Sequence, residues 1–313
     1  MKLNNIKIIL YYYIYTKLMF FGCLSIFLLM TLFLQFSSLT TAFNQLSLSG
    51  GGSFGAVEIG ILKRILETDA KTYDLYTGIS AGALNAGFLS YFSNLKTGVK
   101  AAEKMYASIH NLLIYNILPP TGISVLNTEP LFKTLTKVID GMPGEPVIHT
   151  LIGTTNLYSG NLDVYTFEDN DDLNKVLLLM SSSAIPGIFP PINYNGQLYA
   201  DGGTLSNELL QVKGQTGYLN ITYITPYEGY IYNDEPITSV KDMFKRTLDI
   251  VLSNFNNPLS TLNQNCANPV GEINKYFVSP EYLEDYNSLN FDTGEELITI
   301  GYKYVTSRKY KIC

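Results

Sequence analysis

The chain has 313 residues, of which 46% are hydrophobic and 15% charged, and its formal net charge is −6. This composition is typical of a globular protein with one large domain or two small ones, and it excludes an extensively disordered chain. The acidic balance argues against a nucleic-acid partner and against general attraction to anionic membrane surfaces, so any contact with lipid has to be apolar and local.

The first predicted element is an export segment. Residues 18–36 form an uncharged apolar run that follows three lysines, and small residues precede Phe43 as at a cleavage site. The run is longer than the ~7–15 residues of a signal-peptide core and approaches the ~20 that span a bilayer. Residues 1–42 are therefore predicted to be a signal peptide or an N-terminal membrane anchor. Either places the protein in the secretory pathway, secreted or anchored, and the remaining chain has a charge of −9.

The next segment repeats a strand, a glycine-containing turn and a helix. Residues 45–49 alternate as a strand, three glycines follow, and a helical pattern continues to about Glu67. A second strand over 73–77 also leads into a helix. This order predicts an α/β fold with a central, largely parallel but mixed sheet and helices on both faces. We expect one domain over residues 43–313.

The rest of the chain continues with alternating elements. The predicted elements are a helix over 99–117, strands in "HTLIGTTNL" and "LDVYTFED", a helix in "DDLNKVLLLMSSSAI", a hairpin with Asn195-Gly196 at its tip, a strand in "YLNITYITP", a helix over 239–255, a strand near Tyr276 and a helix after Thr293.

The second turn carries the pattern of a nucleophile elbow. Gly78-Ile79-Ser80-Ala81-Gly82 stands between a strand and a helix, as the G-x-S-x-G motif requires. Gly78 and Gly82 let the turn pass close to its neighbours without side-chain clashes. A glycine-rich turn with an idle serine is the competing interpretation. A catalytic Ser80 needs a base within hydrogen-bond reach.

The first turn, "SLSGGGSFGAVEIG", presents backbone N–H groups at the start of a helix. It lacks the Gly-Lys-Ser/Thr ending of a phosphate-binding Walker loop. Its glycines at 50, 52 and 55 do fit the dinucleotide pattern G-x-G-x-x-G, with Asp74 near the position of the ribose-binding acid. An oxyanion hole is favoured instead, because a serine elbow occupies the adjacent turn.

A third motif supplies the base. "LYADGG" places Asp201 at the end of a hairpin strand, followed by Gly202 and Gly203. An aspartate there is most often a structural turn residue. Combined with the other two motifs, it offers a carboxylate that takes the proton of Ser80 without a histidine relay. Partial burial is then expected, because a base needs a pKa closer to working pH than ~3.9.

These motifs, in this order, resemble the patatin-like phospholipase family of lipid acyl hydrolases with a Ser-Asp dyad. Residues 50–55 look like its oxyanion loop, residues 78–82 like its elbow, and residues 201–203 like its D-G-G/A motif. "SSSAIPGIFPPI", residues 181–192, is similar to its proline block, and "LITIGY" to its C-terminal segment. The resemblance covers a motif-bearing core over 46–203 and leaves a remainder over 204–313.

The resemblance implies a mechanism and a substrate class. Ser80 would attack a carboxylic ester of a phospholipid or related lipid and form an acyl-enzyme, while Asp201 would act as the base. The N–H groups of Gly50, Gly51 and Gly52, with help from Ala81, would hold the oxyanion. No metal and no cofactor is implied. The expected partners are a lipid substrate and a membrane or lipid interface, with the oligomeric state left open.

One position departs from the family pattern. Phe54 stands where the family usually has Arg or Lys. A catalytically weak or inactive lipid-binding protein that retains the fold is therefore the alternative function. A nucleotide-binding oxidoreductase, based only on the glycine spacing, is a third. His110 and His149 are expected to have structural roles.

Two further features concern modification. Cys266 and Cys313 are a disulfide candidate, since a pair of cysteines in an exported domain could bridge, although two buried thiols are the alternative. Asn220 begins a glycosylation sequon inside a strand-like run, so occupancy is expected only if that strand lies at a sheet edge. No Cys/His spacing suggests zinc.

Overall fold

The computed structural model describes residues 42–69, 71–117, 123–211, 217–229, 231, 236–239, 242–243, 246–247, 250 and 269–313. Residues 43–215 and 219–313 belong to one compact unit. The predicted boundary between 1–42 and 43–313 stays a prediction, because the export segment lies outside the described residues. Among the helices that the structure does describe, none has the length and apolar character needed to cross a membrane.

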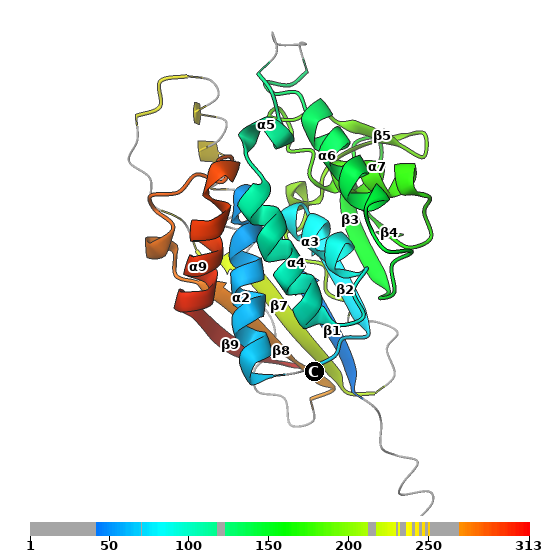
Figure 1. The fold of residues 1–313 in the computed structure, drawn as a ribbon, viewed down its shortest axis with the longest axis vertical. Coiled ribbons are helices and arrows are strands. Elements are labelled where there is room, and N and C mark those ends of the chain that lie inside the picture. The colour runs from blue at the N-terminus through cyan, green and yellow to red at the C-terminus, as the bar shows by residue number, and fades with distance from the viewer. Residues whose placement is uncertain are drawn as a thin grey trace, which may run out of the picture. The chain divides into compact units, whose positions relative to one another are not determined.

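The described residues form a nine-stranded sheet in the order β5-β6-β3-β2-β1-β7-β8-β9, with β4 paired to β3 (Figure 1). The strands are β1 (Phe43–Leu48), β2 (Leu75–Ile79), β3 (Thr150–Asn156), β4 (Leu162–Thr166), β5 (Ile192–Tyr194), β6 (Gln197–Asp201), β7 (Leu219–Tyr227), β8 (Gly271–Val278) and β9 (Val305–Ile312). The five central strands run parallel, and β4, β5, β6 and β9 join by antiparallel pairing. The predicted α/β class with a mixed, centrally parallel sheet is confirmed.

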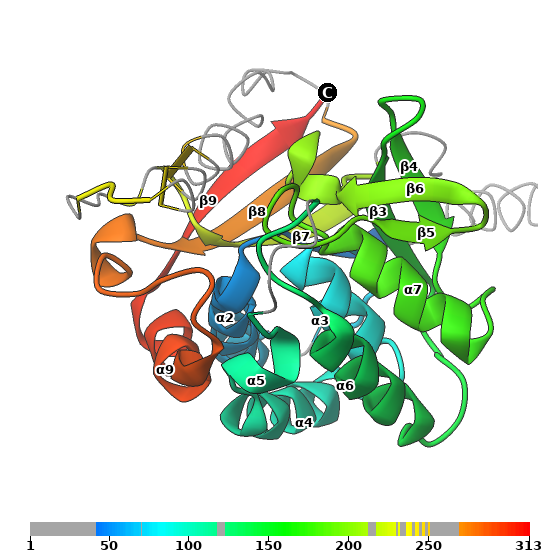
Figure 2. The ribbon, with the colours of Figure 1, turned by 90° about the horizontal axis from the view of Figure 1, so that it is seen from above.

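The labelled helices lie together on one face of the sheet (Figure 2). They are α2 (Gly55–Thr68), α3 (Ala81–Leu89), α4 (Leu95–Ser108), α5 (Asn111–Ile114), α6 (Glu129–Asp140), α7 (Asp172–Ser182) and α9 (Gly294–Tyr304). Four short 3-10 turns in the described residues include η1 (Gly52–Phe54) and η2 (Gly202–Thr204). The predicted helix over 239–255 lies largely outside the described residues.

The central strands are buried on both faces, and the two faces differ chemically. Leu46 and Leu48 of β1 belong to the main hydrophobic core beside the helices. Gln45 and Ser47 are also fully buried, and their side chains donate hydrogen bonds to the carbonyl oxygen of Leu209 at 2.8 and 3.2 Å. The segment after Asp201 therefore covers the second face of β1.

Several elements differ from the expectation. The helix predicted over 99–117 ends at Ser108 and restarts as the single turn α5, with His110 between them. Neither α6 nor β9 was expected. Strand β9 reads "VTSRKYKI" and exposes four consecutive residues, so its apolar pattern is weak, and its pairing with β8 fixes it as a strand.

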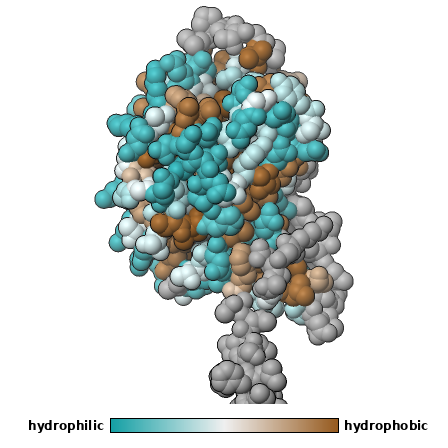
Figure 3. All heavy atoms as spheres, turned by 90° about the vertical axis from the view of Figure 1, so that its right-hand side faces the viewer, coloured by the Kyte–Doolittle hydropathy of each residue, from teal (hydrophilic) through white to brown (hydrophobic). Residues whose placement is uncertain are grey.

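The molecular surface that faces the viewer in Figure 3 is mostly hydrophilic, and its apolar residues lie in separate small groups. This distribution is ordinary for the surface of a globular protein.

Candidate active site

Ser80 occupies a strained turn between β2 and α3. Its backbone has φ 54° and ψ −124°, a conformation that non-glycine residues rarely adopt and that costs on the order of 1–3 kcal/mol. Its N–H donates to Ser182 Oγ at 2.8 Å, and its carbonyl accepts from Ala83 and Leu84 as α3 begins. The structure therefore places Ser80 on the strand-turn-helix elbow that the sequence predicts.

Gly78 and Gly82 are required by close backbone approach. A Cβ on Gly78 would lie 2.4 Å from the carbonyl oxygen of Gly82, and a Cβ on Gly82 would lie 2.4 Å from the carbonyl group of Leu48. Both contacts are with backbone atoms, which side-chain rotation cannot relieve. The two motif glycines thus let α3 begin directly against the ends of β1 and β2.

Sheet register brings Asp201 to the elbow. In β6, Asp201 pairs with Thr154 of β3, and the neighbouring residue Gly153 pairs with Ile79 of β2. Ser80 Oγ donates a hydrogen bond of 2.7 Å to Asp201 Oδ2. Asp201 Oδ1 accepts the N–H of Gly203, also at 2.7 Å. Two residues that are 121 positions apart in the chain thus meet directly.

The pair is shielded from solvent, with 6% of Ser80 and 5% of Asp201 exposed. Burial raises the pKa of Asp201 from 3.8 to about 7, against the opposing effect of its hydrogen bonds with Ser80 and Gly203. A carboxyl with this pKa is ionised near neutral pH and still basic enough to accept a proton from a hydroxyl. Gly202 sits against β3, where a Cβ would lie 2.5 Å from the carbonyl oxygen of Gly153.

The first glycine of the triple-glycine loop is not an available donor. The N–H of Gly50 donates to Asn207 Oδ1 at 2.9 Å, and Asn207 Nδ2 donates back to the Gly50 carbonyl at 3.2 Å. The buried Asn207 amide therefore clamps both polar groups of Gly50. The expectation that Gly50 contributes to an oxyanion hole is wrong for this conformation, because its N–H already has an internal acceptor.

The N–H groups of Gly51 and Gly52 differ from that of Gly50 in their hydrogen bonding. Within the described residues, no acceptor binds their N–H groups or that of Ala81 at the start of α3. Both glycines line one pocket with Ser80 and Asp201. A Cβ on Gly51 would meet Pro226 at 2.8 Å, and one on Gly52, which has φ 59°, would meet the Ser288 carbonyl oxygen at 2.2 Å. Each glycine of the loop is thus packed against a different segment.

The patatin-like phospholipase family model matches residues 46–212, slightly more than half of the chain. The chain belongs to this family. The match begins in β1 and ends beyond Asp201, so it includes all three motifs that the structure brings together. The members of this family are lipid hydrolases as a class.

Individual relatives are distant. Uncharacterized NTE family proteins of Mycobacterium bovis and Mycobacterium tuberculosis are 25% identical over 164 residues, which is 52% of this chain and 26% of theirs. The match therefore spans about a quarter of the length of these relatives. Among solved structures, VipD from Legionella pneumophila has a TM-score of 0.40 at 14% identity, covering 85% of this chain and 68% of its own. ExoU, in its complex with SpcU from the type III secretion system of Pseudomonas aeruginosa, has a TM-score of 0.31 at 12% identity, covering 86% and 53%.

Three residues that support this patatin-like site were not singled out from the sequence. Ser182 accepts from the Ser80 N–H and donates to the Gly153 carbonyl at 2.7 Å, so it ties the elbow to β3. It lies in the proline block, which could have identified it. Asn207 follows the D-G-G motif closely. Ser288, whose carbonyl accepts from the Ser53 N–H at 2.7 Å, has no sequence signal.

A buried polar network lies beneath the loop. Glu58 of α2 accepts from the Ser49 N–H at 2.7 Å and from Asn85 Nδ2 at 2.9 Å. Asn85 of α3 also donates to the Gly55 carbonyl at 2.9 Å and accepts from the Tyr106 hydroxyl at 2.8 Å. Burial raises the pKa of Glu58 well above its ordinary value. The network connects β1, α2, α3 and α4 behind the two motif turns.

Phe54 replaces the cation of the family pattern with aromatic packing. Its side chain is buried, and its ring meets that of Tyr227 edge to face with centroids 5.8 Å apart. Such pairs contribute ~0.5–1.5 kcal/mol beyond their area burial. The loop at Gly55 is thus braced against the end of β7 by an apolar contact.

The dinucleotide interpretation of the glycine spacing is wrong on geometric grounds. Asp74 precedes β2, whereas the glycine loop follows β1, and the two strands run parallel. Asp74 therefore lies at the opposite edge of the sheet, where its carboxylate accepts from the Asn44 N–H at 2.8 Å. A ribose-binding acid would have to stand at the edge that holds the glycines.

The two histidines lie apart from Ser80. His149 precedes β3 and contacts Glu168 through Nδ1, and His110 stands exposed between α4 and α5. In the described residues there is no group of three or more His, Cys, Asp or Glu side chains that could hold a metal ion.

The predicted glycosylation site at Asn220 and the predicted disulfide between Cys266 and Cys313 are tested to different extents by the structure. Asn220 lies in β7, which is an interior strand between β1 and β8, and its Nδ2 donates to Asn44 Oδ1 at 3.2 Å. The condition of an edge strand for glycosylation is therefore not met. Cys313 is disulfide-bonded, while Cys266, its predicted partner, lies outside the described residues.

Proposed function

We propose that this chain is a serine hydrolase that cleaves carboxylic esters of lipids. The observation that carries the proposal is the 2.7 Å hydrogen bond from Ser80 Oγ to Asp201 Oδ2. Gly51 and Gly52 line the same pocket, and among the described residues no acceptor binds their N–H groups or that of Ala81. Membership of the patatin-like phospholipase family supports the lipid substrate.

In the acylation step, Ser80 Oγ attacks the ester carbonyl as its proton passes to Asp201. The carbonyl oxygen becomes an oxyanion, which the N–H groups of Gly51, Gly52 and Ala81 receive. One such donor lowers the activation free energy by roughly 3–4 kcal/mol. Asp201 then returns the proton to the leaving alcohol as the tetrahedral intermediate collapses to an acyl-enzyme.

In the deacylation step, a water molecule takes the place of the alcohol. Asp201 accepts a proton from this water, and the resulting hydroxide attacks the acyl carbonyl, with the oxyanion held by the same amides. Collapse releases the fatty acid and restores the Ser80 hydroxyl. A single carboxyl thus handles every proton, because it already lies within hydrogen-bond distance of the nucleophile.

The setting of the reaction is part of the proposal. A lipid interface would supply the substrate, and the predicted export segment over 1–42 would direct the protein to the secretory pathway, where it is secreted or remains anchored. N-terminal sequencing of the native protein would distinguish a chain that begins near Phe43 from an uncleaved one.

The decisive experiment combines turnover with active-site labelling. Ser80→Ala and Asp201→Asn are expected to reduce hydrolysis of a lipid ester at least about a thousandfold, because each removes one half of the dyad. Ser90→Ala and Asp74→Asn are matched controls outside the site and should retain activity. A fluorophosphonate probe should label the wild type and not Ser80→Ala. Failure to label folded wild-type protein would favour the alternative of a lipid-binding protein without catalysis.

A further inference from the structure

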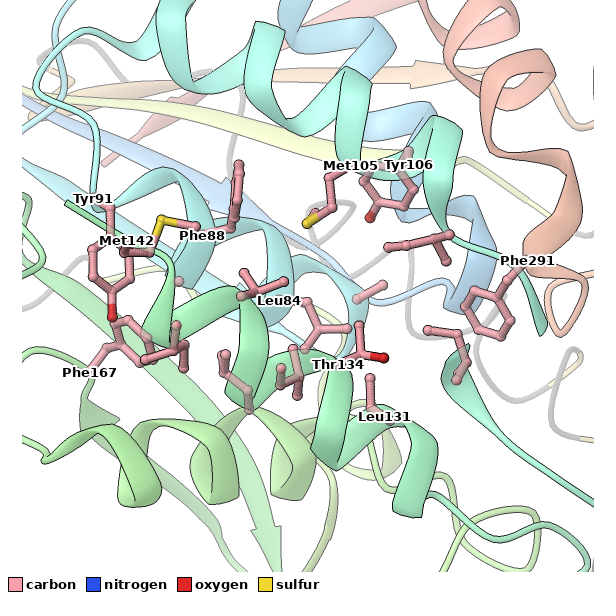
Figure 4. Close-up of a pocket in the computed structure, with 18 of the residues that line it drawn as sticks. Leu84, Phe88, Tyr91, Met105, Tyr106, Leu131, Thr134, Met142, Phe167 and Phe291 are labelled. Atoms are coloured by element: carbon pink, nitrogen blue, oxygen red, sulfur yellow. The ribbon is translucent and has the colours of Figure 1, made fainter. Parts of the chain in front are cut away.

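An apolar cavity extends from the glycine loop into the helical layer (Figure 4). Gly52 lines both this cavity and the pocket of Ser80 and Asp201, and Ala81, the residue after Ser80, lines the cavity as well. The cavity therefore begins at the reacting centre.

The residues that line this cavity are chemically compatible with a hydrocarbon chain. They carry no charged side chain and consist mainly of aliphatic and aromatic residues from α3, α4 and α6. The hydroxyl of Thr134 is satisfied by the Leu113 carbonyl, and that of Tyr106 by Asn85 Oδ1, both at 2.8 Å. Neither needs a bond from a ligand. Each methylene group that leaves water for such walls gains ~0.8 kcal/mol.

The length of the cavity follows from the spacing of its lining residues along helix α3. The lining residues Ala81, Leu84, Gly87 and Tyr91 recur at intervals of three and four, so they share one face of this helix and the turn that follows it. Ten residues at 1.5 Å per residue span about 15 Å. Carbon–carbon bonds of about 1.5 Å with tetrahedral angles advance an extended chain by about 1.25 Å per carbon, which gives about twelve carbons.

Three large side chains line the far end of the cavity. Figure 4 shows Tyr91, Met142 and Phe167 close together there, and the rings of Tyr91 and Phe167 meet edge to face with centroids 6.2 Å apart. The Tyr91 hydroxyl is buried and has no hydrogen-bond partner among the described residues. Burial raises the pKa of Tyr91 to about 12, against the opposing charge of Lys175, which is only 1% exposed and forms ion pairs with Glu145 and Asp172 at 2.5 and 3.2 Å. A hydrocarbon chain that passed this wall would have to displace water or partners from a buried ammonium group.

We propose that the cavity binds the acyl chain of the substrate and that the wall of Tyr91 and Phe167 limits this chain to about twelve carbons. The inference rests on the proposed function, because the cavity is an acyl site only if Ser80 is the nucleophile. With the ester carbonyl at Ser80 and the oxyanion at Gly52 and Ala81, the chain continues along α3 away from the glycine loop.

Gly87 provides a position at which the length can be changed. It lies about 9 Å along α3 from Ala81. A Cβ there would lie 3.1 Å from the side chain of Leu179 and 3.3 Å from the ring of Phe167, so both side chains would have to shift by a few tenths of an ångström. Gly87→Leu therefore fills the cavity beyond about seven carbons. Met142→Ala removes side-chain volume at the far end and should do the opposite.

The test measures hydrolysis of p-nitrophenyl esters with 4, 8, 12 and 16 acyl carbons. Gly87→Leu should reduce the dodecanoyl rate at least about tenfold more than the butyryl rate, since several buried methylene groups are displaced. Met142→Ala should raise the ratio of hexadecanoyl to dodecanoyl hydrolysis. Gly98→Leu is the matched control. A Cβ on Gly98 of α4 would also lie 3.1 Å from a leucine side chain, that of Leu89, but Gly98 does not line the cavity.

The outcomes separate this inference from the proposed function. If Gly87→Leu lowers all four rates equally, or if Gly98→Leu reproduces its length dependence, the acyl-site assignment is overturned while Ser80 remains a nucleophile. If wild-type protein hydrolyses no ester of any length and resists fluorophosphonate labelling, the proposed function falls and this inference falls with it. Should Gly87→Leu fail to fold, an unchanged length profile in Met142→Ala overturns the assignment by itself.

Discussion

The buried carboxyl of Asp201 makes activity depend on pH in one direction. Burial raises its pKa to about 7, and only the ionised form can accept the proton of Ser80. We therefore expect kcat/KM to fall about tenfold per pH unit below pH 7 and to level off above it. Initial rates on a soluble ester between pH 5 and 9 measure this. A profile that stays flat down to pH 5 would show that the base is a different group or an unshifted carboxyl.

The same residue makes stability depend on pH in the opposite direction. Because the folded-state pKa lies above that of the unfolded chain, the folded protein holds this proton more tightly. Its contribution is therefore most favourable at low pH and is lost as pH rises through about 7. Above pH 7 the buried charge costs about 4 kcal/mol.

Asp201→Asn removes that charge and should raise the free energy of unfolding by a few kcal/mol at pH 8 and by much less at pH 4. Urea unfolding at both values measures the difference. The Asn side chain can still accept from Gly203, while its NH₂ group donates to Ser80 Oγ. An equal gain at both pH values would assign the effect to packing and not to charge.

At the scale of elements, helix α3 is pressed against the sheet at its first turn. Gly82→Ala would place a methyl group 2.4 Å from the backbone of Leu48, so we expect a loss of about 1–3 kcal/mol or more. Gly98→Ala, in the neighbouring helix α4, meets only side-chain atoms of Leu89 and Phe92 and gains ~1 kcal/mol of helix propensity. Thermal melts should therefore separate the two variants clearly. Equal melting temperatures would mean that the backbone of β1 shifts to accommodate the methyl group without a loss of stability.

Elements with strong local patterns were predictable. The strand, glycine turn and helix sequences around Gly51 and Ser80 identified both motif turns, because neighbouring atoms leave no space for a side chain at the motif glycines. Asp201 was predictable from its position before two glycines, together with the other two motifs. The hydrogen bond between Ser80 and Asp201 depends on the register of β3 with β2 and β6, which local patterns do not encode.

Other features were not predictable for the same physical reason. Strand β9 has an exposed, charged pattern and exists through its pairing with β8. The amide of Asn207 removes Gly50 from the donors, although the sequence makes all three glycines look alike. The ion pairs of Lys175 with Glu145 and Asp172 join two chain segments that the sequence does not connect.

At the scale of the whole molecule, the part that matches the family does not form the sheet alone. Strand β1 lies between β2 and β7, and β7 follows residue 212. A chain truncated after residue 212 would leave β1, whose last four residues are fully buried, as an unpaired sheet edge, which favours aggregation. We expect this truncated chain to be insoluble or oligomeric in sedimentation experiments, while residues 43–313 remain folded. A monomeric, cooperatively folding chain of residues 43–212 would contradict this.

The glycine loop is supported from outside the motif region, at the carbonyl of Ser288 and at the ring of Pro226. These two anchors lie outside the residues that the family model matches. Proteins with identical signature residues can therefore evolve different turnover rates through substitutions around positions 226 and 288. A comparison of turnover rates between relatives therefore has to consider their C-terminal sequences as well as their motifs.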